Sequence, residues 1–108
     1  MMRSIMFGVV LLMGVASVAS AQDKAKGAQV YADQKCSVCH AIAGKGNAKG
    51  ALDDIGSKRS VDDIRQWIVD AKTMTAKTKA ARKPEMKGYT LPKDEVDALV
   101  AYLTSLKK

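Results

Sequence analysis

Five consecutive residues, Cys36 to His40, carry the most specific chemistry in the sequence, and they read Cys-Ser-Val-Cys-His. Two thiols three positions apart on a turn can form thioether bonds with the two vinyl groups of one porphyrin. The imidazole of the next residue can then coordinate the iron. The C-x-x-C-H pattern therefore predicts one haem c, attached covalently through Cys36 and Cys39, with His40 as an iron ligand.

Three other uses of these cysteines fit the sequence less well. A thioredoxin-like C-x-x-C belongs to a βαβ scaffold, which the sequence does not suggest. A plain disulfide of an exported protein would leave His40 without a role. A structural zinc site needs four cysteine or histidine ligands, whereas the chain contains three such residues.

The second axial ligand of the iron can be narrowed by counting, because His40 is the only histidine and only Met74 and Met86 lie beyond the first 21 residues. Met86 lies between Pro84 and Gly88 in an irregular stretch, where a loop can fold over the haem face opposite His40. Met74 lies in an Ala/Lys/Thr run, where a single methionine is more often a packing residue. We expect Met86 to be the ligand, with Met74, water, a lysine or an external ligand as alternatives. A methionine ligand raises the reduction potential.

The first 21 residues have the composition of a secretory signal peptide. Arg3 is their only charge, an apolar run extends from Ile5 to Ala19, and Ala19-Ser20-Ala21 is a small-x-small ending. An uncleaved anchor is the rival interpretation, but the run of about 15 residues is shorter than the roughly 20 that span a bilayer. We expect cleavage after residue 21, a periplasmic protein and no membrane span afterwards.

The remaining 87 residues, 22–108, form one small domain without an internal repeat. A domain of this size buries little apolar surface and usually needs a staple or a cofactor. Without Arg3, 17 lysines and arginines face 11 acids, a net charge of +6. A basic surface attracts acidic partners. Nucleic acid is not expected as a partner, because the signal peptide predicts export and the chain contains no nucleic-acid-binding motif.

Three helices are expected around the motif. The first covers residues 23–34, the second begins at Ser60, and the third begins at Pro92 with Asp94 and Glu95 in its first turn. Residues 36–56 are too rich in glycine for a helix and are expected to form a long loop. Residues 72–83 are either frayed helix or loop. No segment alternates with period two, so we predict an all-α domain. The apolar stripe of the third helix is Val96, Leu99, Val100, Leu103 and Leu106.

Several residues occur in an order that resembles small bacterial class I monohaem cytochromes c. Besides the C-x-x-C-H, they are Gly27, Tyr31, Leu52, Ile55-Gly56, Trp67, Met86 and Ala101-Tyr102-Leu103. The resemblance covers essentially the whole of 22–108. It implies three to five helices wrapped around one haem, with the first and last helices crossing and Gly27 allowing close approach to the Tyr102 region.

The resemblance also implies roles for residues outside the motif. Leu52 is expected to contact the haem, and Trp67 is either a core aromatic or an indole donor to a haem propionate. The family commonly has a proline shortly before Leu52 whose carbonyl accepts the ring N–H of the axial histidine, but this sequence has Lys49-Gly50-Ala51. We expect the Gly50 carbonyl or a neighbour to be the acceptor. Lys87 replaces the proline that often follows the axial methionine.

With both axial positions filled, iron has no open site for a substrate, and we predict a monomeric one-electron carrier rather than an enzyme. Two alternatives are a cytochrome subunit held by a periplasmic dehydrogenase or oxidase, and a ligand-binding haem protein or sensor with a labile sixth position. Acidic redox partners are expected to dock at the exposed haem edge, surrounded by Lys35, Lys45, Lys83 and Lys87.

Overall fold

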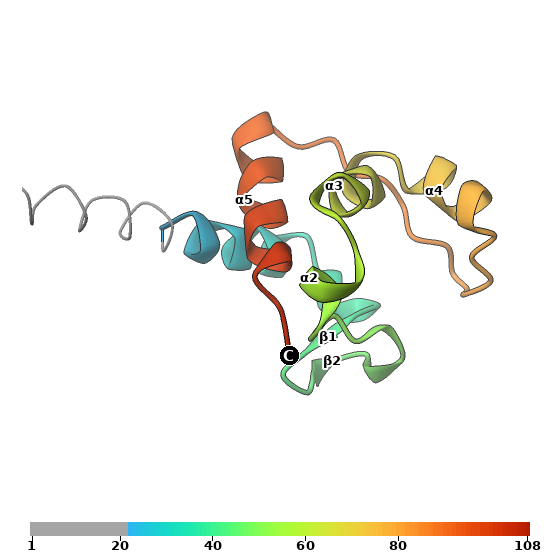
Figure 1. Cartoon of the computed structure of the whole chain (residues 1–108), viewed down its shortest axis with the longest axis horizontal. Coiled ribbons are helices and arrows are strands. Elements are labelled where there is room, and N and C mark those ends of the chain that lie inside the picture. The colour runs from blue at the N-terminus through green and yellow to red at the C-terminus, as the bar shows by residue number, and fades with distance from the viewer. Residues whose placement is uncertain (1–21) are drawn as a thin grey trace, which may run out of the picture.

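Helices make up most of the part of the chain that the structure, a computed structural model, describes, namely residues 22–108 (Figure 1). The N-terminal helix is described over residues 22–33, and α2 (Ile55–Lys58), α3 (Val61–Val69), α4 (Ala71–Thr78) and α5 (Lys93–Thr104) follow. The predicted all-α class is confirmed. The expected signal peptide, residues 1–21, lies outside the described residues. Within 22–108, no helix combines the length and hydrophobicity needed to cross a membrane.

The N-terminal helix crosses α5 (Figure 1), as the family resemblance implies, and Gly27 lies where the two helices meet. Gly27 is buried, and a Cβ placed on it would collide with the Ala98 carbonyl oxygen and lie 2.5 Å from the Cβ of Tyr102. The two helices therefore approach through a position where only hydrogen fits. Tyr31, one turn further along, packs edge-to-face on Tyr102 with ring centroids 6.1 Å apart.

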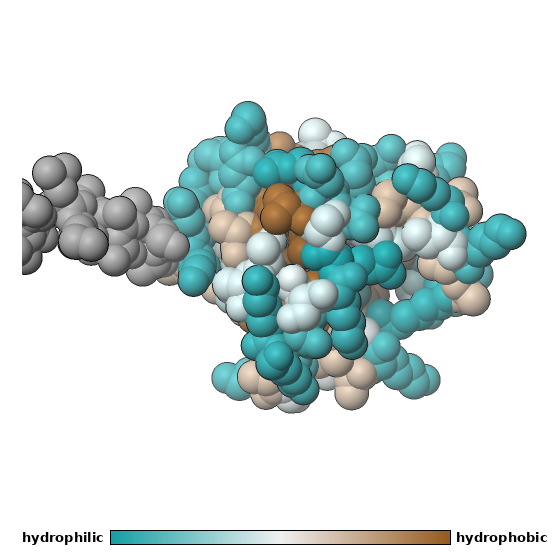
Figure 2. Space-filling view, viewed as in Figure 1, coloured by the Kyte–Doolittle hydropathy of each residue, from teal (hydrophilic) through white to brown (hydrophobic). Residues whose placement is uncertain are grey.

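The core joins the N-terminal helix, α3 and α5. Its buried members are Val30, Ile64, Ile68, Val96, Leu99, Val100 and Leu103. They include four of the five residues expected in the stripe of the last helix. The fifth, Leu106, lies beyond the end of α5 at Thr104 but still packs against the core while partly exposed. The face seen in Figure 2 is mostly hydrophilic, with a small hydrophobic area between α5 and α3.

The start of α3 is confirmed at the predicted cap. The Ser60 hydroxyl oxygen accepts a hydrogen bond from the Asp63 backbone N–H at 3.1 Å, satisfying a donor that has no partner within the helix. Pro92 occupies the N-cap of α5, so this helix begins at Lys93, one residue later than expected. The Pro92 carbonyl accepts the first hydrogen bonds, from Glu95 and Val96, and the proline needs no donor of its own there.

Two segments differ from the simplest expectation. Residues 36–56, expected as a loop, contain short 3-10 turns (η1, Cys36–Val38; η2, Ala48–Gly50) and a minimal hairpin of β1 (Ala41–Ile42) and β2 (Lys45–Gly46). Ala43 and Gly44 connect the strands with φ angles of 53° and 80°, the geometry of a tight primed turn. The undecided run after α3 is helical as far as Thr78, because Ala71, Met74 and Thr75 are buried there.

Candidate haem site

The C-x-x-C-H segment is wound into a compact turn at the end of the N-terminal helix. The carbonyl of Cys36 accepts hydrogen bonds from the backbone N–H groups of Cys39, at 3.1 Å, and His40, at 2.9 Å. This winding brings both thiols and the imidazole toward one cavity. Both cysteines are free of a disulfide and half-buried.

The β1–β2 hairpin holds this turn from behind. The Asn47 backbone N–H donates to the carbonyls of His40, at 2.9 Å, and Ser37, at 3.1 Å. Gly46 has a φ of 109°, and its Cα packs so closely on the turn that a Cβ would meet the His40 carbonyl oxygen. Asn47 and Gly46 are thus positioning residues that the sequence reading did not single out. In the sequence, only the glycine that closely follows the motif could have indicated their role.

His40 is oriented by the acceptor that was expected for it. Its Nδ1 lies 2.9 Å from the Gly50 carbonyl oxygen. Because a carbonyl can only accept, Nδ1 must carry the proton, which leaves the lone pair of Nε2 free for a metal. Burial lowers the pKa of His40, and the nearby Arg82 guanidinium lowers it further, while the bond to Gly50 acts in the opposite direction. The lowered pKa favours the neutral ring, which is the form in which an imidazole can bind a metal.

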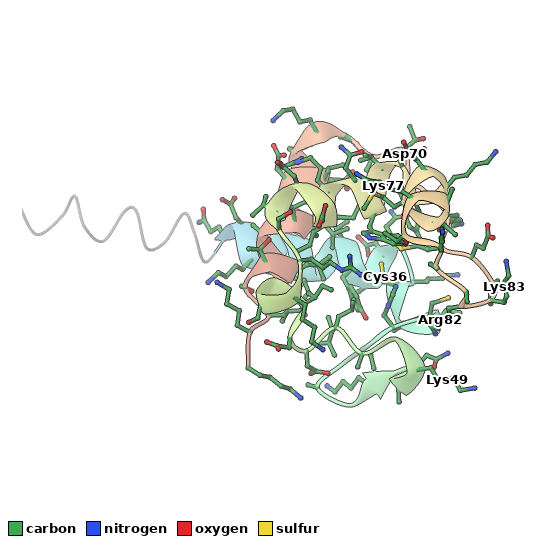
Figure 3. All side chains as sticks on the ribbon, turned by 45° about the vertical axis from the view of Figure 1, so that its right-hand side comes forward. Cys36, Lys49, Asp70, Lys77, Arg82 and Lys83 are labelled. Atoms are coloured by element: carbon green, nitrogen blue, oxygen red, sulfur yellow. The ribbon has the colours of Figure 1, made fainter. Side chains whose placement is uncertain are left out.

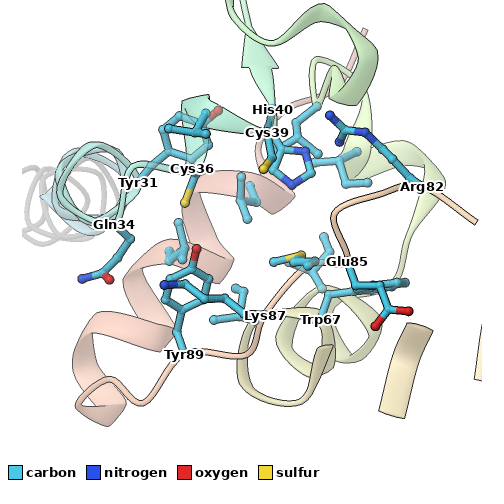
Figure 4. A pocket seen from close by; sticks show the side chains of 18 of the residues that line it. Tyr31, Gln34, Cys36, Cys39, His40, Trp67, Arg82, Glu85, Lys87 and Tyr89 are labelled. Carbon is cyan, nitrogen blue, oxygen red and sulfur yellow. The ribbon is translucent and has the colours of Figure 1, made fainter. Parts of the chain in front are cut away.

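A cavity of about 640 Å³ opens in front of these residues, within the range of cofactor sites. Cys36, Cys39 and His40 form one wall (Figure 4). Among the described apolar residues lining the rest are Leu52, Ile55, Ile64, Ile68, Leu99 and Leu103. The side chains of the core thus enclose a space instead of filling it.

The opposite wall comes from the segment between α4 and α5. Met86 lines the cavity, and its neighbours Glu85 and Lys87 lie across from His40 in Figure 4. Met74 does not line the cavity, and only 6% of it is exposed in the packing of α4. Of the two candidate methionines, the structure brings Met86 to the same space as His40.

Trp67 and Leu52, the two other predicted site residues, also line the cavity. Trp67 projects from α3, is half-buried and does not belong to the buried core cluster. Its place is thus at the cavity wall on the core side. Leu52 packs against the core and is fixed by a 2.8 Å hydrogen bond from its N–H to the Ala41 carbonyl.

The predicted ring of lysines is only partly assembled. Lys35 and Lys87 line the cavity, and the Lys87 Nζ lies 5.4 Å from the centroid of the Tyr89 ring. Lys45 and Lys83 do not line it, and Lys83 instead pairs with Glu85 at 2.8 Å. Arg59 and Arg82 contribute charge at the wall and were missed, because nothing in the sequence distinguishes them from other surface cations.

A buried polar atom without a hydrogen-bond partner at the cavity wall is consistent with a large prosthetic group in this space. Among the described residues, the Tyr31 hydroxyl is buried without a hydrogen-bond partner, and Tyr31 is a lining residue. Burial raises the pKa of Tyr31 to about 12. Burial also raises the pKa of the Cys36 thiol and of Tyr89. A covalent haem is held by two thiols, a neutral imidazole and a thioether, and all of these groups line the cavity. The apolar walls and the volume of the cavity also fit a haem.

Comparison with known proteins decides the family. The family described as Cytochrome c matches residues 24–107, nearly all of the described chain. The chain belongs to the cytochrome c family. With this assignment, Cys36 and Cys39 are the attachment points of one covalent haem c rather than a redox disulfide or a zinc site. Members of the family typically carry electrons rather than catalyse reactions on substrates.

The cytochrome is also 29% identical, over 91 residues, to cytochrome c oxidase subunit 2 of Alkalihalophilus pseudofirmus. The alignment covers 76% of this chain but 25% of that protein, so the chain spans about a quarter of the relative's length. No solved structure matches this chain significantly.

Proposed function

We propose that this cytochrome is a periplasmic one-electron carrier whose iron is closed by His40 and Met86. The observation that carries the proposal is that His40 and the segment of Met86 face each other across one cavity that the two cysteines also border. Haem c, when bound, supplies a one-electron change between ferric and ferrous iron. The chain attaches it, orients an imidazole toward it and excludes water with apolar side chains.

The identity of the methionine ligand is tested on protein matured with haem. The oxidised protein and Met74→Ala should show the methionine–iron charge-transfer band, whereas Met86→Ala should lose it and have a lower midpoint potential. Met74→Ala is a matched control, because it removes the same side chain from outside the cavity. If the wild-type band is absent and carbon monoxide binds readily to the reduced protein, the iron is open and the carrier function is wrong.

For Trp67 we propose a hydrogen bond from the indole N–H to a haem propionate, because the side chain lies at the cavity wall. Trp67→Phe keeps an aromatic ring but removes the donor. We expect its midpoint potential to shift while the charge-transfer band is retained. An unchanged potential would assign Trp67 to packing alone.

Acidic redox proteins are the proposed donor and acceptor, docking where Lys35 and Lys87 border the cavity. Export through cleavage after residue 21 is part of the proposal. The measured mass of the protein isolated from the periplasm should therefore match a chain that begins at Gln22. A mass that includes residues 1–21 would contradict cleavage.

A permanently bound subunit is the second candidate function. Similarity to one quarter of a cytochrome c oxidase subunit 2 favours it, since that relative is part of a larger oxidase. Gel filtration of the native protein distinguishes the two. A free carrier elutes as a monomer of its own mass, and a subunit elutes with its complex.

A further inference from the structure

Arg82 belongs to the segment that carries Met86, yet its side chain reaches the opposite wall. A Cβ placed on Gly50 would collide with the Arg82 Nη1 and the Cys39 carbonyl oxygen, and would lie 2.9 Å from the His40 Nδ1. One small space thus borders the guanidinium, the Gly50 backbone and the ring nitrogen that Gly50 fixes. Figure 4 shows the guanidinium beside the imidazole.

Arg82 forms no ion pair with a carboxylate within residues 22–108. The ion pairs of residues 22–108 are Lys26–Asp94, Arg65–Asp97, Lys83–Glu85 and Lys93–Asp97, none of which includes Arg82. Glu85, the acidic residue nearest to Arg82 in sequence, forms its ion pair with Lys83 instead. A full positive charge therefore remains at the edge of the His40 ring.

We propose that Arg82 tunes the reduction potential of this cytochrome upward by placing a fixed positive charge beside the proposed axial ligand His40. The inference rests on the proposed function, because it requires His40 to bind the iron. A nearby cation disfavours the ferric state, which carries one more positive charge than the ferrous state. It also makes the Nδ1–H···O=C bond less able to push electron density onto the ring, and such bonds tune the metal.

Gly50 is what gives the guanidinium access. The family resemblance leads us to expect a proline shortly before Leu52, and a proline ring at Gly50 would occupy the space that Arg82 enters. The residue lacking a side chain still supplies the carbonyl that His40 needs. Loss of the proline and approach of a cation are thus two aspects of one local arrangement.

The test is a redox titration of the haem-loaded protein with four substitutions. Arg82→Gln should lower the midpoint potential by at least about 28 mV, a threefold change in the ferric/ferrous equilibrium at 59 mV per tenfold. Arg82→Lys should recover at least half of the loss, and Arg82→Glu should lower the potential further. Lys77→Gln removes the same charge from an exposed residue of α4 outside the cavity wall and should leave the potential near that of the wild type.

A second readout separates charge from packing. Because Arg82 is exposed, the difference between wild type and Arg82→Gln should shrink as ionic strength rises, with the charge-transfer band intact throughout. An unmoved potential, or an equal shift in Lys77→Gln, overturns the role of Arg82. A shift that Lys does not rescue and salt does not reduce overturns it as well. Absence of the band in the wild type instead contradicts the proposed iron ligands.

Discussion

The two ring nitrogens of His40 have separate tasks, and the division between them is set by one backbone carbonyl. The 2.9 Å contact to Gly50 holds the proton on Nδ1 and directs Nε2 into the cavity. Gly50, which has no side chain, leaves room for the Arg82 guanidinium beside this carbonyl. The carbonyl, not the side chain, is what this position must supply.

Gly50→Ala should disturb the haem site directly, since its Cβ has no space beside the Cys39 carbonyl, Arg82 and the His40 ring. We expect a loss of about 1–3 kcal/mol in the free energy of unfolding, from overpacking, together with a shifted midpoint potential. Denaturant unfolding and redox titration measure the two effects.

Gly44→Ala is the matched control, because no atom lies within 4 Å of a Cβ at that hairpin position. Its φ of 80° costs backbone strain of about 1 kcal/mol but leaves the haem site untouched. If the two variants change the potential equally, the space at Gly50 has no role in orienting His40.

Individual residues differed in how well the sequence revealed them. The motif Cys36 to His40 was recognisable because its chemistry depends on covalent spacing within five residues. Arg82 and Asn47 were not, since each acts on residues distant in sequence through the path of a loop. A cation or an amide looks the same in a sequence whether it lies against solvent or against a residue of the haem site.

At the scale of elements, local signals predicted the helix starts well and the weaker segments poorly. Ser60 caps α3 through its own hydroxyl, which depends only on residues within one turn. By contrast, α4 has no apolar stripe in sequence, and it is helical because Met74 and Thr75 find buried positions against other elements. The hairpin was missed because strands of two residues are too short to show alternation.

Gly27→Ala should reverse the sign that helix propensity predicts. Alanine is favoured over glycine inside a helix by about 1 kcal/mol. Here its Cβ would collide with the Ala98 carbonyl and the Tyr102 Cβ, so we expect a net loss of about 1–3 kcal/mol in thermal or denaturant unfolding.

Ala32→Gly provides the comparison for this helix, because Ala32 is exposed and its substitution changes propensity alone, by about 0.5–1 kcal/mol. A stabilised Gly27→Ala protein would mean that the N-terminal helix and α5 can separate without cost.

For the whole molecule, the positive charge is concentrated rather than spread. Residues 71–87 contain six lysines and arginines and one acid, a net of +5, while 22–108 carry +6 in total. This stretch comprises α4 and the segment after it, on one side of the molecule in Figure 1, and Figure 3 shows Arg82 and Lys83 there. The molecule is therefore a charge dipole with its positive end at the Met86 side.

Reversing Lys72, Lys77 and Lys79 to glutamate should slow association with an acidic redox partner and flatten its dependence on salt, because steering acts through this end. Stopped-flow electron transfer over a range of ionic strength measures both. The same number of reversals at Lys24, Lys58 and Lys107 keeps the net charge equal and should change the rate less. Equal effects of the two sets would show that only net charge matters.

Backbone hydrogen bonds hold the segment that carries Met86 only at its two ends. Ala80 N–H bonds to Thr75 and Tyr89 N–H bonds to Ile68, but residues 81–88 make no backbone–backbone hydrogen bond within the described chain. The proposed bond from Met86 to iron is then the fastening of this segment, and its strength depends on oxidation state. Reduction of the iron and opening of residues 81–88 are therefore thermodynamically linked through the proposed Met86–iron bond.

Because a thioether binds ferrous iron more strongly, opening of 81–88 should cost more in the reduced protein. Each 59 mV that the methionine adds to the potential corresponds to about 1.4 kcal/mol of extra opening free energy. Hydrogen exchange at Tyr89 should accordingly be slower in the ferrous protein, while amides in the middle of α5 serve as a reference. Equal exchange rates in the two oxidation states would show that the loop is not coupled to the iron. Slower exchange in the ferrous protein would mean that the reduction potential reports the stability of this short loop.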